Sequence, residues 1–424
     1  IMSNYEFVLL IYSNVFLAII SILFSFLLYF VIFKKDIYSI FDPLFFFLFF
    51  SSIGFATVLF LVLKEKIGDY ETFQYFITQF SFIFGFKIIN KKGRILEKKI
   101  SNSEYNFGNK ILQTFLVILI FSKLFTFYIE GFPIFSESRL SYLFSDNIFV
   151  RISNRIYSTL ITPTIILIFI YLSLKIQKKH IFYLLILVII TILEGAKSSI
   201  INFIMLGFLV SMALHFNYQK NHLYNYIIKR GIKILIFTVL LTSLVILSSN
   251  SNPLLTIFHR ISVAGDSFFM TYPNNVLSEI IPPVDKNIFL QLFKGPLNNL
   301  NIINTDLKPL GFKIMEYHTG AIGIQKGPII RHNIMGYAYM NIIQSSIYSL
   351  SVGLLLGVSR AKIFKLTSEK PISICLYILL FVLTLRLPSD FYRFFNSIID
   401  FLIILVPLTA IIEIIYRRKN ALKY

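Results

Sequence analysis

Long uninterrupted apolar runs recur along this chain of 424 residues, and they restrict its fold more than any other feature. Each run is about 20 residues long, which is the length that an α-helix needs to cross a lipid bilayer. A membrane β-barrel is built from short strands in which apolar and polar residues alternate, and these runs do not alternate. Only a helix satisfies its backbone hydrogen bonds within one segment in lipid. The sequence therefore predicts an all-α fold, a polytopic transmembrane helical bundle.

We expect about eleven spans with a large external loop late in the chain. The predicted spans are 7–33, 43–63, 72–89, 111–129, 156–174, 181–194, 198–216, 232–248, 334–358, 371–387 and 394–416. The chain would then divide into an N-terminal membrane region (1–248), the external loop (249–333) and a C-terminal membrane region (334–424). The first run has neither a basic leader nor a small-residue cleavage site, so we interpret it as a retained span.

Basic residues occupy every second loop, and this alternation predicts the topology. Lys and Arg concentrate in loops on the cytoplasmic side of a membrane protein. The predicted cytoplasmic loops lie near residues 34–35, 91–99, 175–179, 229–233, 360–365 and 417–419. The N-terminus is then expected outside and the C-terminus inside. Residues 64–71, 130–155, 194–198, 249–333 and 388–393 would face outward.

Composition and motifs exclude several classes of function. The net charge of +19 arises largely from short loops that would touch anionic lipid headgroups, so we expect no nucleic-acid partner. The one cysteine, Cys375, excludes a disulfide framework and a cysteine metal cluster. No HExxH zinc spacing and no nucleotide-binding glycine loop is present. We therefore expect no metal and no cofactor.

Several arginines and one lysine lie where the topology places the outer membrane edge, against the bias for cytoplasmic charge. Charged groups within or beside spans often face a polar cavity and serve a function. The guanidinium fork binds phosphate through two hydrogen bonds, so a converging set would bind a diphosphate. The alternative is that each side chain reaches lipid phosphates or pairs locally. These cations are Arg139, Arg151, Arg155, Lys197, Arg260, Arg331, Arg386 and Arg393.

Three residues are the predicted candidates for a general base. His332 follows Arg331 directly, and a neighbouring cation lowers the pKa of an imidazole and keeps it neutral and able to accept a proton. Asp266 and Asp390 are the rivals, with Glu137 and Glu194 behind them. For the histidine the alternative is a hydrogen bond to loop backbone, and for each acid it is a structural ion pair with a nearby Arg or Lys.

The stretch "LEGAKSS" (193–199) places charges between two apolar runs. We interpret it as the outward turn of a helical hairpin, with Ser198 and Ser199 at the N-terminus of the next helix, where anions bind well. Lys197 would then bind a phosphate, or instead pair with Glu194 three residues before it.

Tyrosines are abundant, and some are placed to stack against sugars at the outer face. The other interpretation is that they mark the level of the lipid headgroups. The candidates are Tyr317, Tyr337, Tyr339 and Tyr392.

Together these features resemble the oligosaccharide repeat-unit polymerases that make bacterial O-antigen and capsular polysaccharides. The resemblance rests on the span pattern with one large late external loop and on three stretches. These are "GFPIFSESR" after the fourth span, "EGAKSS" between two short spans, and "RHNIMGYAYMN" at the start of the ninth.

The resemblance implies a membrane-embedded glycosyltransferase of the bacterial inner membrane that uses no metal. It would transfer the growing glycan from undecaprenyl diphosphate to a hydroxyl of the next lipid-linked repeat unit, so both donor and acceptor are lipid-linked oligosaccharides. A flippase and a chain-length regulator are further expected partners. The positions that match the family's diphosphate-binding arginines are Arg139, Lys197, Arg260 and Arg331, with lysine where arginine is more usual at 197.

Three other functions remain open: an O-antigen ligase, a flippase or transporter, and a non-catalytic scaffold of a polysaccharide export complex. An O-antigen ligase shares the donor and the diphosphate chemistry and differs mainly in its acceptor. A flippase or transporter of lipid-linked sugars would place charged residues deep within spans, where this sequence has few besides Lys123 and Glu413.

Overall fold

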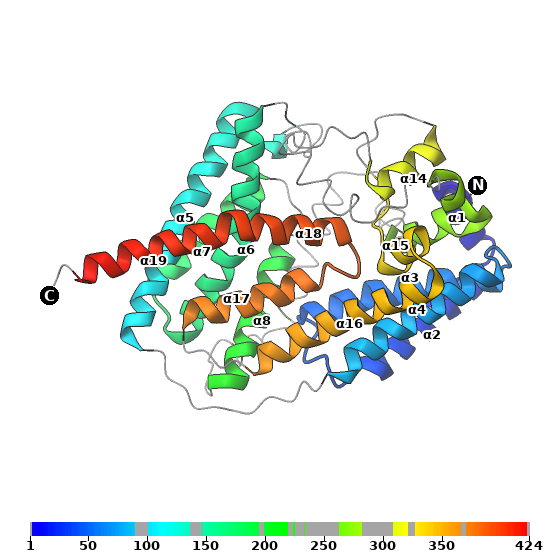
Figure 1. The fold of residues 1–424 in the computed structure, drawn as a ribbon, viewed down its shortest axis with the longest axis horizontal. Helices are drawn as coiled ribbons and strands as arrows, with labels where there is room; N and C mark the ends of the chain where they lie inside the picture. Colours follow the sequence, from blue (N-terminus) through cyan, green and yellow to red (C-terminus); the bar gives the residue numbers. More distant parts are fainter. Residues whose placement is uncertain are drawn as a thin grey trace. The chain divides into compact units, whose positions relative to one another are not determined.

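The computed structural model describes most of the chain, and every regular element in the described part is helical (Figure 1). The described residues are 2–89, 101–135, 145, 147–194, 199–218, 224, 233, 263–281, 308–320, 327–365 and 370–421. The prediction of an all-α fold is confirmed for this part. Arg139, Lys197 and Arg260 lie outside the described residues, as does nearly all of the predicted span 232–248.

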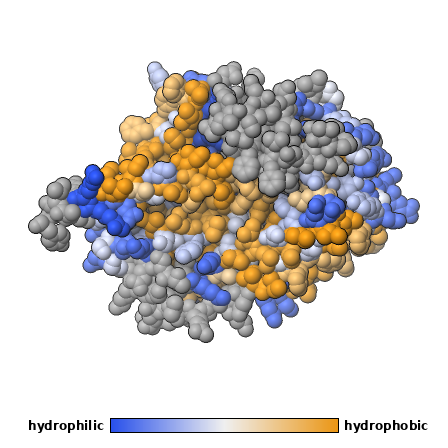
Figure 2. Space-filling model, in the orientation of Figure 1, coloured by the Kyte–Doolittle hydropathy of each residue, from blue (hydrophilic) through white to orange (hydrophobic). Residues whose placement is uncertain are grey.

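Six helical segments in the described part are long and apolar enough to cross a membrane. Two shorter apolar helices are Ile201–Phe216, within α8 (Ser199–Tyr218), and α17 (Pro371–Thr384). Broad apolar areas cover the face of the molecule drawn in Figure 2, and Phe16 on the first span is 79% exposed. These features indicate a membrane protein. The six are α2 (Val15–Phe33), α3 (Pro43–Leu63), α5 (Asn102–Glu130), α6 (Ile148–Leu174), α16 (Ile342–Phe364) and the segment Phe391–Arg418.

Two of the predicted spans are interrupted in the structure. The run 7–33 divides into α1 (Asn4–Tyr12) and α2, because Ser13 and Asn14 turn their side chains back to the carbonyl of Leu10 and compete with the helical hydrogen bonds.

The run 334–358 divides into α15 (His332–Tyr339) and α16. Here Asn341 and Gln344 exchange side-chain and backbone hydrogen bonds of 2.8 and 3.3 Å, which starts a new helix at residue 342.

The chain forms two compact units, and each draws on segments from distant parts of the sequence. Unit 1 comprises Ile1–Asn90, Asn250–Ser359 and Leu383–Asn396, and unit 2 comprises Lys91–Ser249, Arg360–Val382 and Ser397–Tyr424. Besides the helices already named, unit 1 contains α4 (Asp69–Ile88), η3 (Val263–Gly265), α11 (Asp266–Thr271), η4 (Pro273–Asn275), α12 (Val276–Ile280) and α14 (Leu310–Thr319).

Helices α4 and α16 of unit 1 pack closely because glycines remove side chains from their interface (Figure 1). A β-carbon on Gly85 would collide with the carbonyl oxygen of Leu350, and one on Gly353 would collide with the carbonyl oxygen of Phe82. Small residues allow close backbone approach between membrane helices, where van der Waals contact replaces the hydrophobic effect. The α4–α16 contact fixes the elements that carry the candidate site.

Unit 2 is built mainly on the pair α5 and α6, with α7 (Lys178–Leu193) and α8 packed against α6. The C-terminal segment joins α18 (Phe391–Asp400), the π-helical turn η6 (Phe401–Leu405) and α19 (Val406–Ala421). An ion pair of 3.3 Å between Arg155 and Asp400 ties α6 to the end of α18. Arg155 thus has a structural partner in place of the lipid phosphate considered from the sequence.

We predict that Gly85→Ala lowers the thermal stability of the detergent-solubilised protein. The added methyl group meets rigid backbone, and overpacking of this kind costs about 1–3 kcal/mol. Ser351→Ala on the exposed face of α16 is the matched control and is expected to leave the melting temperature unchanged. Equal melting temperatures for Gly85→Ala and wild type would contradict the packing account.

Candidate functional site

One face of α4 carries the side chains that fix the candidate site of unit 1. Gln74, Thr78 and Phe82 recur every four residues and therefore line a single face of the helix. Asn333 of α15 donates from Nδ2 to Thr78 Oγ1 at 2.8 Å, and its carbonyl oxygen accepts from Gln74 Nε2 at 3.1 Å. Tyr272 in turn donates its hydroxyl to Gln74 Oε1 at 3.0 Å. These buried hydrogen bonds hold the N-terminus of α15 against α4.

His332, the first residue of α15, is buried and held on three sides. Its ring stacks on Phe82 with 5.0 Å between ring centres, and Nδ1 lies 3.0 Å from Ser349 Oγ. Its backbone N–H donates to the carbonyl of Pro388 at 3.0 Å. Burial, reinforced by the adjacent Arg331, lowers the pKa of His332 to about 3. The imidazole is therefore neutral near pH 7, as the sequence predicted.

Arg331 is partly buried, and its guanidinium makes hydrogen bonds that stabilise the fold. Nη2 donates to the carbonyls of Phe50 and Ala264 at 2.9 and 2.6 Å, which ties α3 to η3. The group also lies over the Phe268 ring at 5.7 Å. A β-carbon at Gly54 would lie 3.1 Å from Cζ, so that glycine leaves room for the guanidinium. Because Nη2 already donates two hydrogen bonds, a phosphate would accept hydrogen bonds from the remaining donors, Nε and Nη1.

Asp266 begins α11 two residues after the carbonyl that Arg331 binds. Burial raises the pKa of Asp266 to about 7, against the opposing effects of the Ser267 backbone N–H, 2.7 Å from Oδ1, and of the Arg331 charge. Such a carboxyl group changes protonation state near neutral pH, which suits a general acid or base. The 3-10 turn η3, which ends at Gly265, directly precedes α11.

Asp390 lies in the turn that His332 contacts. Its backbone N–H donates to the Arg386 carbonyl at 2.7 Å, and its side chain accepts from the Arg393 backbone N–H at 3.0 Å. Burial raises the pKa of Asp390. Burial and the nearby charge of Arg393 lower the pKa of Arg386 to about 10. Two guanidinium groups close enough to affect each other thus share this turn with one carboxylate.

Four of the seven predicted site residues lie in the described part of the chain, and all four belong to unit 1: Asp266, Arg331, His332 and Asp390. The link between residues 332 and 388 joins segments that are far apart in the sequence. Arg386 and Arg393 lie on either side of Asp390 in this turn region. Both are among the cations that the sequence places at the outer membrane edge, but neither was matched to the diphosphate-binding positions of the family. Among the described residues, no group of three His, Cys, Asp or Glu side chains could hold a metal ion. The arrangement supplies fixed cations beside acids with raised pKa values.

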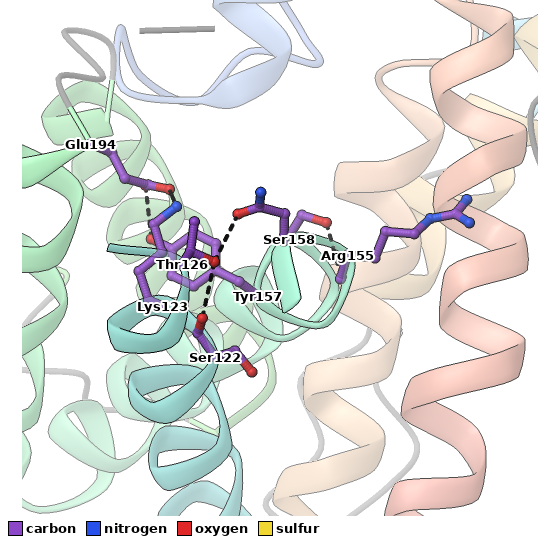
Figure 3. Close-up of polar contacts among 8 residues, drawn as sticks. Ser122, Lys123, Thr126, Arg155, Tyr157, Ser158 and Glu194 are labelled. Carbon is purple, nitrogen blue, oxygen red and sulfur yellow. Dashed lines mark hydrogen bonds and ion pairs between the residues drawn. The ribbon is translucent and has the colours of Figure 1, made fainter. Parts of the chain in front are cut away.

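Unit 2 contains a second buried polar cluster, centred on Lys123 and Glu194 (Figure 3). The Lys123 ammonium pairs with Glu194 Oε1, and Tyr157 donates its hydroxyl to Oε2 at 2.9 Å. The ammonium also lies 4.5 Å from the centre of the Tyr157 ring. Thr126 hydrogen-bonds Ser122 and Asn154 next to this group, at 3.1 and 3.4 Å. Three helical elements, α5, α6 and the end of α7, are thereby joined inside the apolar bundle.

Glu194 belongs to the stretch "LEGAKSS", for which the sequence left open whether Lys197 binds a phosphate or pairs with Glu194. The Glu194 carboxylate has partners on α5 and α6, namely Lys123 and Tyr157. Whether Lys197 binds a phosphate stays a prediction, because that residue lies outside the described part of the chain. A polar residue at position 123 within an apolar run was the available signal for this cluster.

No known protein family matches this chain, and neither a curated protein nor a solved structure resembles it closely enough to count as a match.

We predict that Lys123→Met destabilises the protein strongly, by about 3–5 kcal/mol, because the Glu194 carboxylate remains buried without its cation. The double variant Lys123→Met with Glu194→Gln removes both charges and should be more stable than Lys123→Met alone. Thermal unfolding of the two single variants and the double variant in one detergent measures the coupling. Strictly additive effects would show that the two side chains do not interact.

Proposed function

We propose that this protein polymerises oligosaccharide repeat units carried on undecaprenyl diphosphate, at the outer face of a bacterial cytoplasmic membrane. It would act as a glycosyltransferase that builds O-antigen or capsular polysaccharide. Apolar helices suit a substrate with a long lipid tail, and the candidate site combines arginines with a carboxyl group that titrates near pH 7. The sequence resemblance contributes the choice of substrate class.

One observation carries most of the proposal, namely the proximity of Arg331 and Asp266. Arg331 is fixed by the Ala264 carbonyl, and Asp266 follows two residues later. A partly buried cation with donors left over suits an anionic leaving group. A neighbouring acid with a pKa of about 7 suits the removal of a proton from an acceptor hydroxyl. The two functions that a glycosyl transfer needs therefore lie on adjacent groups.

The proposed reaction is a direct displacement at the anomeric carbon of the donor. An acceptor hydroxyl gives its proton to Asp266, and its oxygen forms the new bond to that carbon. The bond from the carbon to the diphosphate oxygen breaks, and the lipid diphosphate leaves with the electron pair. Negative charge grows on the leaving oxygen, so cations already in place stabilise the transition state more than the ground state. Arg331 would supply this stabilisation, helped by Arg386 and Arg393.

A flippase for lipid-linked oligosaccharides is the second candidate, and the Lys123–Glu194 pair favours it. Ionisable residues deep within membrane helices commonly line transport pathways. A flippase would move the lipid-linked repeat unit across the membrane without forming a new glycosidic bond. The appearance of longer glycans from purified components would therefore exclude it. An O-antigen ligase would form one bond to a different acceptor lipid and would not produce a ladder.

We predict that Arg331→Ala reduces long glycan chains by roughly 100-fold in cells that lack the wild-type gene, as expected for loss of one group that stabilises the leaving charge. Gel analysis of surface polysaccharide measures the ladder. Arg417→Ala, which alters an exposed arginine paired with Glu413, is the matched control and should leave the ladder intact. Because Arg331 also ties α3 to η3, the melting temperature of Arg331→Ala must equal that of the wild type, so that the loss of glycan chains is not due to unfolding. A full ladder from Arg331→Ala contradicts the assignment.

The pH dependence of polymerisation should distinguish the two leading bases. If Asp266 is the base, only its ionised form is active, so the rate rises from about pH 6 and levels off by about pH 8. Asp266→Asn should then lower the rate by about 10²- to 10⁴-fold. If His332 is the base, its pKa of about 3 gives a flat profile over this range. We expect the rising profile, and a flat one would transfer the role to His332.

A further inference from the structure

Tyrosines and carboxylates meet on an exposed part of unit 1. We call this the tyrosine–glutamate surface and define it by six residues: Tyr70, Glu71, Asn275, Glu279, Tyr317 and Tyr337. Tyr70 is 53% exposed and lies in the first turn of α4. Glu71 belongs to the same turn, and the other four residues come from η4, α12, α14 and α15, so five separate elements contribute.

Two tyrosine hydroxyls are oriented by carboxylates on this surface. Tyr337 lies 2.8 Å from both Glu71 Oε1 and Asn275 Oδ1, and its one hydroxyl hydrogen can serve only one of them at a time. Tyr317 donates to Glu279 Oε2. The rings of Tyr70 and Tyr337 lie 6.1 Å apart and are tilted by 48°. Both glutamates keep further acceptor positions, and the exposed ring of Tyr70 offers a flat apolar face.

A continuous row of aromatic rings connects this surface to the candidate site. The Arg331 guanidinium lies over Phe268, which stacks on Tyr272 with 5.8 Å between ring centres. Tyr272 contacts Tyr337 at 5.5 Å, and Tyr337 contacts Tyr70. Phe268 and Tyr272 are buried, so the row begins beside Arg331 and becomes accessible only at its outer end.

We propose that the tyrosine–glutamate surface binds a pyranose ring of the repeat unit and holds it at a fixed distance from Arg331. This inference rests on the proposed function for the identity of the sugar. An aromatic side chain pairs an apolar face with a polar tip, which matches a sugar with an apolar C–H face and a rim of hydroxyls. The free acceptor positions of Glu71 and Glu279 would receive sugar hydroxyl hydrogens.

The charge of the surface favours a sugar over a lipid headgroup, the other usual neighbour of tyrosines in membrane proteins. In the described part of the chain, the two tyrosine hydroxyls contact carboxylates and Asn275, and no Lys or Arg is among their partners. The carboxylates of Glu71 and Glu279 repel phosphate groups and anionic lipids that approach these hydroxyls. Neutral sugars with many hydroxyl donors do not meet this repulsion.

The experiment uses the fact that the chain contains no tryptophan. Tyr70→Trp places a single fluorophore on the surface, and Tyr128→Trp places one at an exposed site that is 89% accessible on α5. Each full-length variant in detergent is titrated with the repeat-unit oligosaccharide released from its lipid by mild acid. We expect a saturable change in emission for Tyr70→Trp and none for Tyr128→Trp. Soluble short-chain phosphatidylglycerol should give no saturable change.

Adding Glu71→Gln to Tyr70→Trp should weaken sugar binding about fivefold, the effect of losing roughly one hydrogen bond, while an acceptor for Tyr337 is retained. A response to phosphatidylglycerol but not to the oligosaccharide would overturn the proposal in favour of a headgroup site. No response to the oligosaccharide, with wild-type protein still making a ladder, would overturn it while the proposed function stands. Saturable sugar binding without any ladder would uphold the surface and refute the polymerase.

Discussion

Polar side chains inside an apolar bundle must satisfy one another, and this constraint organises both units. In unit 1, Gln74 and Thr78 of α4 hydrogen-bond to Asn333 of α15. These hydrogen bonds hold the N-terminus of α15, where Arg331 and His332 lie. In unit 2, Lys123, Glu194 and Tyr157 join α5, α6 and the end of α7. Breaking either set leaves buried polar groups without partners, which costs more than the intact hydrogen bonds contribute. A few buried polar residues therefore determine which helices pack against each other within each unit.

The apolar runs were sufficient to predict helices such as α3, α5 and α6, because a helix in lipid is specified by local sequence. The breaks at Ser13–Asn14 and at Met340–Asn341 were not predicted. Hydropathy averages over a window, and a capping side chain changes the backbone at one position without changing that average. Asn341 followed by Gln344 three residues later was a readable signal for the second break. The number of spans and the orientation of the chain stay predictions.

The candidate site was visible in sequence only in pieces. The adjacency of Arg331 and His332 was enough to predict the direction in which the pKa of the imidazole shifts, whereas the burial that contributes most to the shift depends on tertiary packing. The bond between His332 and Pro388, and the partnership of Glu194 with Lys123, depend on tertiary packing that no linear pattern encodes. The structure also shows a role of Arg331 that the sequence did not indicate. Its two carbonyl partners make it a structural link between α3 and η3 as well as a candidate ligand for phosphate.

In the proposed polymerase, each step of glycan extension is coupled to the release of one lipid diphosphate. The most direct measurement incubates the purified protein with isolated lipid-linked repeat units and quantifies both the glycan length and the free undecaprenyl diphosphate. We expect a ladder of glycans, with one lipid diphosphate released for each bond formed. Repeat units that remain unextended, with no lipid diphosphate released by active-fold protein, would contradict it.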